Sequence, residues 1–180
     1  MSGGERLLEF YSGRGRDDRG RLLREILAWP DDTLEDVHDY IQWLFPLTEP
    51  SAFNPRAPLL DQAAIREFRR SDDLRRAVTA SFERMLRFYG FEMAPDLECE
   101  IHRAPNFAER AREWLYPMNH NHLRITRILK CLRLVGLEAQ AAAFFAALEK
   151  LYNEDPRPGI TAETFRYWRE AAGAQTKRNE

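Results

Sequence analysis

Residues 72–90 of this 180-residue chain read DDLRRAVTASFERMLRFYG, and this stretch decides the fold class. Its apolar residues recur at spacings of four and three, which is the period of one face of an α-helix. Ser71 precedes the stretch as an N-cap, and Gly90 follows it as a C-terminal stop. The pattern predicts one long amphipathic helix whose apolar stripe consists of Leu74, Val78, Phe82, Met85 and Tyr89.

Helical patterns continue on both sides of this stretch. They predict a helical turn over 6–11 and helices over 21–28, 32–45, 62–70, 107–115, 121–135, 137–152 and 162–172. Residues 91–105 are compatible with a short strand around 97–101 or with a loop. The sequence therefore predicts an all-α, compact single-domain helical bundle of about eight helices. The domain should span residues 6–172, with flexible termini at 1–5 and 173–180.

Composition narrows the class of protein. The chain is 44% hydrophobic and 31% charged, and its net charge of −2 creates no field that would recruit nucleic acid or an anionic membrane. The longest apolar stretches, 40–48 and 139–148, are shorter than the roughly 18 residues that span a bilayer. With no signal peptide and two cysteines outside any CxxC pair, we expect a cytoplasmic protein without a transmembrane segment. An excess of arginine over lysine, 24 to 3, predicts a bacterial source.

Two of the predicted helices carry apolar residues on more than one side. In the 32–45 helix, Trp43 adds bulk outside the main stripe, and in the 121–135 helix Leu123 lies nearly opposite the stripe. A helix that is apolar all round is usually surrounded by others, so we expect these two helices to be central. Arg124 or Arg127 should then be at least partly buried, and its guanidinium needs partners.

The partners of such a guanidinium allow two interpretations. In the first, the carboxylate of Asp39 or Glu35 forms a permanent ion pair with the guanidinium, and the cluster is a structural network. In the second, the two helices form a site for a peptide terminus, a small anion or a protein partner. His38 and Gln42, one helical turn apart, would face this ligand. The residues of this predicted ligand-binding site are His38, Gln42, Trp43, Asn121, His122, Arg124 and Arg127.

Other function classes have weaker support. Cys99-x-x-His102 and His120-x-His122 offer four zinc ligands, but the favoured interpretation is a solvent-facing loop and a helix-capping histidine. An enzyme that acts on a small anionic substrate at a cluster of His, Arg and Asn residues remains the alternative function. A nucleic-acid-binding helical domain would use a stripe of Arg66, Arg69, Arg70, Arg75, Arg76, Arg84 and Arg87, which neighbouring acids balance. We expect no metal, no cofactor and no catalytic residue.

The two central helices also carry a family resemblance. Residues 38–46, HDYIQWLFP (the first motif), and residues 121–130, NHLRITRILK (the second motif), resemble the conserved region of opioid growth factor receptors. The pattern also matches at Phe10-Tyr11, Trp29, Leu34-Glu35, Asn54, Phe68, Met85-Leu86 and Phe88-Tyr89-Gly90. Vertebrate members of that family are described as receptors for the opioid growth factor, met-enkephalin, and as associated with the nuclear envelope. The resemblance implies the domain and a ligand-binding role without catalytic residues, and it does not imply the opioid as ligand.

Overall fold

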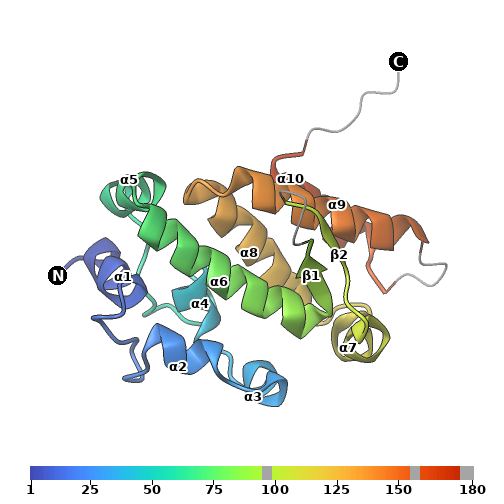
Figure 1. Cartoon of the computed structure of the whole chain (residues 1–180), viewed down its shortest axis with the longest axis horizontal. Coiled ribbons are helices and arrows are strands. Elements are labelled where there is room, and N and C mark those ends of the chain that lie inside the picture. Colours follow the sequence, from blue (N-terminus) through green and yellow to red (C-terminus); the bar gives the residue numbers. More distant parts are fainter. Residues whose placement is uncertain (95–98, 155–158, 175–180) are drawn as a thin grey trace. The chain divides into compact units, whose positions relative to one another are not determined.

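The computed structural model describes residues 1–94, 99–154 and 159–174. Within these ranges it contains ten helices and one two-stranded antiparallel sheet, so the all-α prediction is confirmed (Figure 1). The elements are α1 (Gly3–Tyr11), α2 (Leu23–Leu27), α3 (Asp31–Asp36), α4 (Ile41–Leu44), α5 (Gln62–Arg70), α6 (Asp72–Tyr89), β1 (Phe91–Met93), β2 (Ile101–Arg103), α7 (Phe107–Trp114), α8 (Asn121–Leu134), α9 (Glu138–Glu154) and α10 (Ala162–Ala172).

These elements fall into two compact units. The first unit comprises residues 1–88 together with 134–136, and the second comprises 89–133 and 137–180. The chain thus leaves the first unit at the end of α6 and returns to it for three residues that begin with the last residue of α8. The Nε of Arg69 donates to the carbonyl oxygen of Leu134 over 3.1 Å, which ties the returning residues to α5.

Aromatic side chains form the core of the first unit. The ring of Phe10 lies 5.2 Å from that of Trp43, and the ring of Tyr11 lies 5.2 Å from that of Phe68, so α1 is anchored to both α4 and α5. The hydroxyl of Tyr11 donates to the carbonyl oxygen of Leu44. Each aromatic side chain removes a large apolar area from water, so this cluster contributes strongly to the stability of the unit.

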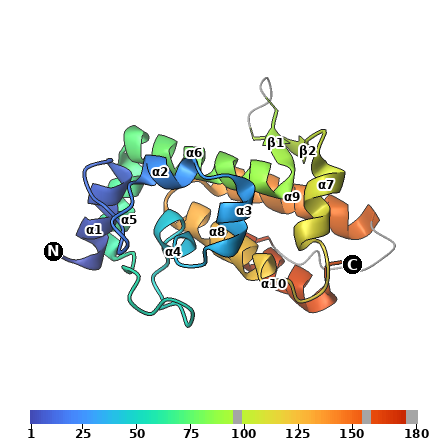
Figure 2. The same cartoon turned by 90° about the horizontal axis from the view of Figure 1, so that it is seen from below.

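The second unit is built around Trp114 and the pair α9 and α10. The indole Nε1 of Trp114 donates to the carbonyl oxygen of Tyr89 over 3.0 Å. The helices α9 and α10 lie side by side, as Figures 1 and 2 show, and the rings of Tyr152 and Phe165 stack 4.1 Å apart. The strands β1 and β2 pair with Phe91 opposite Arg103, and β2 contacts α9.

Most predicted helix ends agree with the structure because their capping residues act as expected. The side chains of Asp61, Ser71 and Thr161 accept backbone N–H groups at the starts of α5, α6 and α10. The start of α1 is three residues earlier than predicted, because Ser2 forms a capping box with Glu5. The predicted strand around 97–101 overlaps β2 only at Ile101, and residues 97–98 lie outside the described ranges.

Candidate functional site

The first motif does not form the single helix that its pattern predicts. The helix α3 ends at Asp36, Val37 is extended with φ −91° and ψ 130°, and a new short helix, α4, begins at Ile41. His38 therefore lies in the link between two helices, where its side chain is exposed. The prediction that His38 and Gln42 stand one helical turn apart is wrong, because the residues between them are not helical.

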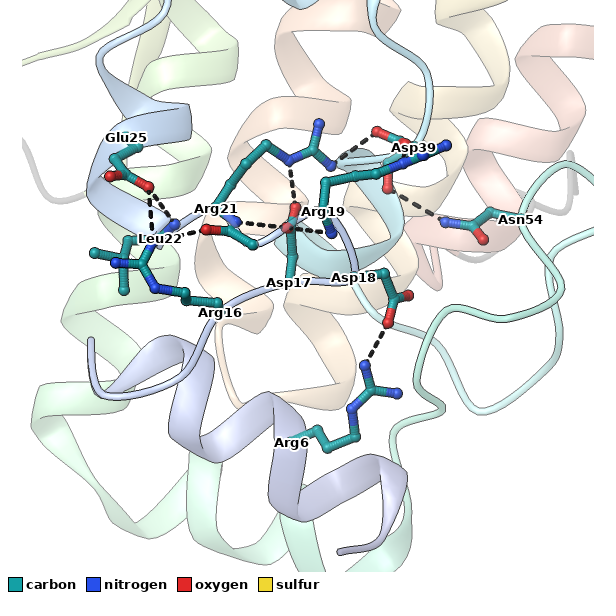
Figure 3. Close-up of polar contacts among 11 residues, drawn as sticks. Arg6, Arg16, Asp17, Asp18, Arg19, Arg21, Leu22, Glu25, Asp39 and Asn54 are labelled. Carbon is teal, nitrogen blue, oxygen red and sulfur yellow. Dashed lines mark hydrogen bonds and ion pairs between the residues drawn. The ribbon is translucent and has the colours of Figure 1, made fainter.

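An arginine–aspartate network holds this link in place (Figure 3). The carboxylate of Asp39 accepts from Arg19 Nε and from Arg21 Nη2, each over 2.8 Å. Arg21 also donates from Nε to Asp17 over 2.6 Å, and the Asp17 side chain has no exposed area. Burial alone would raise the pKa of Asp39, but the hydrogen bonds and charges of Arg21 and Arg19 outweigh burial and lower it.

This network weakens the interpretation in which Asp39 pairs with Arg124 or Arg127. That interpretation paired Asp39 with an arginine of the second motif, whereas both carboxylate oxygens of Asp39 are bound by Arg19 and Arg21. The side-chain amide of Asn54 donates to the backbone oxygen of Asp39 over 3.3 Å, so a loop residue also fixes the link. Sequence reasoning missed Arg19, because its glycine-rich loop has no periodic pattern, and Arg21, because the helix predicted over 21–28 begins only at Leu23.

Gln42 and Trp43 are buried on α4, which confirms that Trp43 is a core residue, as is Phe45. The guanidinium of Arg6 lies over the Trp43 ring, 5.0 Å from its centre. Among the described residues, neither Trp43 Nε1 nor Gln42 Oε1 has a hydrogen-bond partner. The amide nitrogen of Gln42 reaches the Ser51 hydroxyl over 3.4 Å. A buried donor and a buried acceptor on adjacent residues are therefore left unsatisfied.

The second motif begins at a tightly bonded turn before α8. Asn119 donates from its side-chain amide to the Glu113 carbonyl oxygen and accepts from the backbone N–H of Asn121. The imidazole Nε2 of His122 lies 3.0 Å from the Trp114 carbonyl oxygen, so we assign the proton to Nε2. The Trp168 indole donates to the His122 carbonyl oxygen over 3.0 Å. These bonds fix the first turn of α8 within the second unit.

The His122 side chain is 4% exposed, and its ring meets those of Trp114 and Trp168 edge to face. Burial lowers the pKa of His122 from its usual 6.5 and outweighs the opposing hydrogen bond to the Trp114 carbonyl. The imidazole is therefore neutral at pH 7, with Nδ1 as an acceptor. Within the described part of the chain, Nδ1 has no hydrogen-bond partner.

Arg124 is 5% exposed, which confirms the prediction that one of the two arginines of the second motif is buried. Its Nη1 donates to the Asn121 side-chain oxygen over 3.3 Å, and Arg127 is half-buried. Leu123 is 58% exposed, which corrects the expectation of a helix that is apolar on every side. The polar cluster of this motif consists of Asn121, His122 and Arg124, held by the preceding turn and the two tryptophans.

The arginine stripe of α5 and α6 is largely paired within the first unit. Arg70, Arg75 and Arg76 each form an ion pair with an acid three residues earlier in the chain. Arg84, predicted to lie on a solvated face, is instead buried and donates to Asp31 and to the Trp29 carbonyl oxygen. These pairings support the interpretation of the stripe as balanced surface charge rather than a nucleic-acid interface.

The histidine and cysteine pairs are dispersed rather than clustered. His102 pairs with Glu92 on the hairpin, and His122 faces tryptophans. In ranges 1–94, 99–154 and 159–174, no group of three His, Cys, Asp or Glu side chains is placed to hold a metal. Across the same ranges, none of the helices has both the length and the apolar character needed to cross a membrane.

Comparison with known proteins identifies relatives that cover most of the chain. The profile of the opioid growth factor receptor conserved region matches residues 6–180. The opioid growth factor receptor of Rattus norvegicus is 38% identical over 167 residues, covering 89% of this chain and 28% of the relative. The receptor of Homo sapiens is 36% identical over 180 residues, covering 96% and 26%. Opioid growth factor receptor-like protein 1 of Xenopus tropicalis is 41% identical over 122 residues, covering 66% and 23%.

The chain spans about a quarter of the length of these relatives. No solved structure matches it. The profile match covers nearly every residue and includes both motifs, of whose polar side chains Gln42, Asn121, His122 and Arg124 are buried. The chain belongs to the opioid growth factor receptor conserved-region family.

Proposed function

We propose that this chain is a non-catalytic recognition domain that binds a peptide, a small anion or a protein partner through residues of its two motifs. In the first unit these residues are Gln42 and Trp43, with His38 exposed beside them. In the second unit they are Asn121, His122, Arg124 and Arg127. Because both cysteines are free thiols, we also propose a reducing location such as the cytoplasm.

The observation that carries this proposal is the set of buried polar atoms on the motif residues. Trp43 Nε1 is a donor, while Gln42 Oε1 and His122 Nδ1 are acceptors, and none has a partner among the described residues. A buried polar group without a partner costs about 1–3 kcal/mol, so such groups call for a specific explanation. A ligand or partner that supplies the complementary groups would recover that free energy on binding.

The family supports a receptor-like role in a limited sense. The relatives from rat and human are named opioid growth factor receptors, and this chain corresponds to about a quarter of each. We carry over ligand binding by the conserved region as a proposal and leave the chemical identity of the ligand to experiment. The buried, planar guanidinium of Arg124 suits a carboxylate or phosphate better than a neutral group.

The proposal can be tested by nuclear magnetic resonance titration of the isotope-labelled chain with acetate, inorganic phosphate and met-enkephalin. The indole N–H of Trp43 and the imidazole signals of His122 report on the unpartnered atoms directly. We expect at least one probe to shift one of these signals in a saturable manner. Saturable shifts confined to residues outside both motifs would contradict the proposal.

The variant Arg124→Met separates recognition from architecture. If Arg124 serves a binding site, the variant keeps its fold while the response to the probe is lost. If the cluster is structural, the variant loses about 3–5 kcal/mol of stability, because the groups facing a buried charge are left unpaired. Arg133→Met, at an exposed position on the same helix, is the matched control. A variant that keeps both stability and probe response would place the function elsewhere.

A further inference from the structure

A groove with a cavity volume of about 430 Å³ lies in the second unit, away from the motif residues. One wall is β2, from which Ile101, His102 and Arg103 line the groove, and the other is α9, which contributes Ala143, Ala146 and Lys150. Figure 1 shows these two elements next to each other. Neighbouring strand residues point to opposite faces of a sheet. Because residues from both faces of β2 line the groove, the groove runs along the edge of this strand.

That edge of β2 carries backbone groups that no other strand uses. Ala94 donates to the Glu100 carbonyl oxygen and Ala104 to that of Gly90, so the residue pairs that exchange hydrogen bonds include 94 with 100 and 90 with 104. Hydrogen bonding alternates along an antiparallel ladder, so the N–H and C=O groups of Ile101 and Arg103 point away from β1. Within the described ranges these groups have no backbone partner.

The opposite wall leaves room for another strand. Ala143, Ala146 and Ala147 occur at spacings of three and four, so their methyl groups share one face of α9. Ala146 is exposed, and Ala143 and Ala147 are half-buried. Larger side chains at these positions would fill the groove. At a rise of 1.5 Å per residue, the helical wall from Ala143 to Glu154 extends for about 16 Å, the length of roughly five extended residues.

Charged groups mark one end of the groove. The Arg103 guanidinium is held over the Phe107 ring, 4.9 Å from its centre, and donates to Glu154 over 2.8 Å. Lys150 reaches the same carboxylate only at 3.9 Å, and 74% of its side chain is exposed. Two cations thus share one carboxylate, and the ammonium of Lys150 can turn toward a second anion at little cost.

We propose that the groove between β2 and α9 binds an extended peptide segment as a third strand. The backbone of the peptide pairs with Ile101 and Arg103, and its small apolar side chains lie on the alanine face of α9. An acidic residue of the peptide sits beside Lys150 and Arg103. Addition of a strand to a sheet edge combines main-chain hydrogen bonds, which supply affinity, with side-chain contacts, which supply specificity. This site is independent of the motif residues.

Two blocked pentapeptides serve as probes, one for each strand direction: acetyl-Val-Ala-Val-Ala-Glu-amide and acetyl-Glu-Ala-Val-Ala-Val-amide. We expect one of them to bind the 180-residue chain and to slow hydrogen exchange at the Ile101 and Arg103 amides, but not at His102. A version with lysine in place of glutamate, and one with proline at the central position, should each bind at least roughly tenfold more weakly, because each lacks a group that the groove uses. Equal binding of the proline version would overturn the strand-addition proposal.

Matched substitutions on α9 locate the site. Ala146→Phe fills the groove and should weaken peptide binding at least roughly tenfold, whereas Ala142→Phe, at an exposed position on α9 that does not line the groove, should leave it unchanged. Lys150→Glu should reverse the preference between the glutamate and lysine probes. Failure of both pentapeptides to bind at millimolar concentration, or equal affinity of the two phenylalanine variants, would overturn the proposal.

Discussion

His122 should make the stability of the folded chain depend on pH near neutrality. Burial holds the pKa of its imidazole below 6.5 in the folded state, whereas the unfolded chain takes up this proton near 6.5. Between the pKa of the folded state and that of the unfolded state, the unfolded chain binds more protons than the folded chain. The free energy of unfolding therefore rises with pH, and this contribution is lost as the pH falls through 6.5. One unit below 6.5, protonation favours the unfolded state by a factor of about 11, which costs at most about 1.4 kcal/mol for this single group.

The assay is urea unfolding at about pH 7.5, 6.5 and 5.5, with the variant His122→Phe beside the natural chain. We expect the natural chain to lose as much as about 1.4 kcal/mol across this range, and the variant to show a smaller loss because it lacks the titrating group. His120→Gln is the control, since the exposed His120 makes a lesser contribution to the lowered pKa of His122. An equal pH dependence in the natural chain and His122→Phe would refute the reasoning.

Three further predictions concern other parts of the chain. Trp43→Ala should cost about 3–5 kcal/mol in urea unfolding, because the ring is fully buried, while Phe53→Ala at an exposed loop position should cost under about 0.5 kcal/mol. Asp17→Asn should lower the free energy of unfolding by about 1–3 kcal/mol, because the buried carboxylate of Asp17 accepts three hydrogen bonds. Asp18→Asn breaks one exposed ion pair and should lower it by under about 1 kcal/mol. Equal losses in the two variants would contradict this account. A colorimetric thiol reagent should modify the half-exposed Cys99 in the native chain and reach Cys131 only after unfolding. The reason is that burial raises the pKa of Cys131 to about 12. Rapid modification of both thiols in the native chain would contradict this prediction.

Helix positions could be predicted from the sequence where local chemistry determines them. The period of α6, and the capping side chains of Asp61, Ser71 and Thr161, involve residues within one turn of each other. The break between α3 and α4 could not be predicted in the same way. It is stabilised by Arg19 and Arg21, which lie about 20 residues before Asp39 and outside any helix of the structure.

The candidate site was predicted only in part for a similar reason. Apolar patterning placed Trp43 in the core and required a buried arginine in α8, and the structure confirms both. The pattern carries no information on which side-chain atoms find partners. The environment of His122, between Trp114 and Trp168, depends on residues 8 and 46 positions away in the chain. No spacing rule within one helix reports on contacts of that kind.

The return of residues 134–136 to the first unit has a consequence for biosynthesis. Phe88 ends the N-terminal part of that unit, but Leu134, whose carbonyl oxygen accepts from Arg69, is translated roughly 50 residues later. At about 5–20 residues per second, a ribosome needs roughly 2–10 s to supply it. The nascent first unit therefore cannot complete its native contacts before about half of the second unit, residues 89–133, has been synthesised. During translation, the last native contacts of the first unit, such as the Arg69–Leu134 hydrogen bond, thus form only once residues 134–136 have left the ribosome.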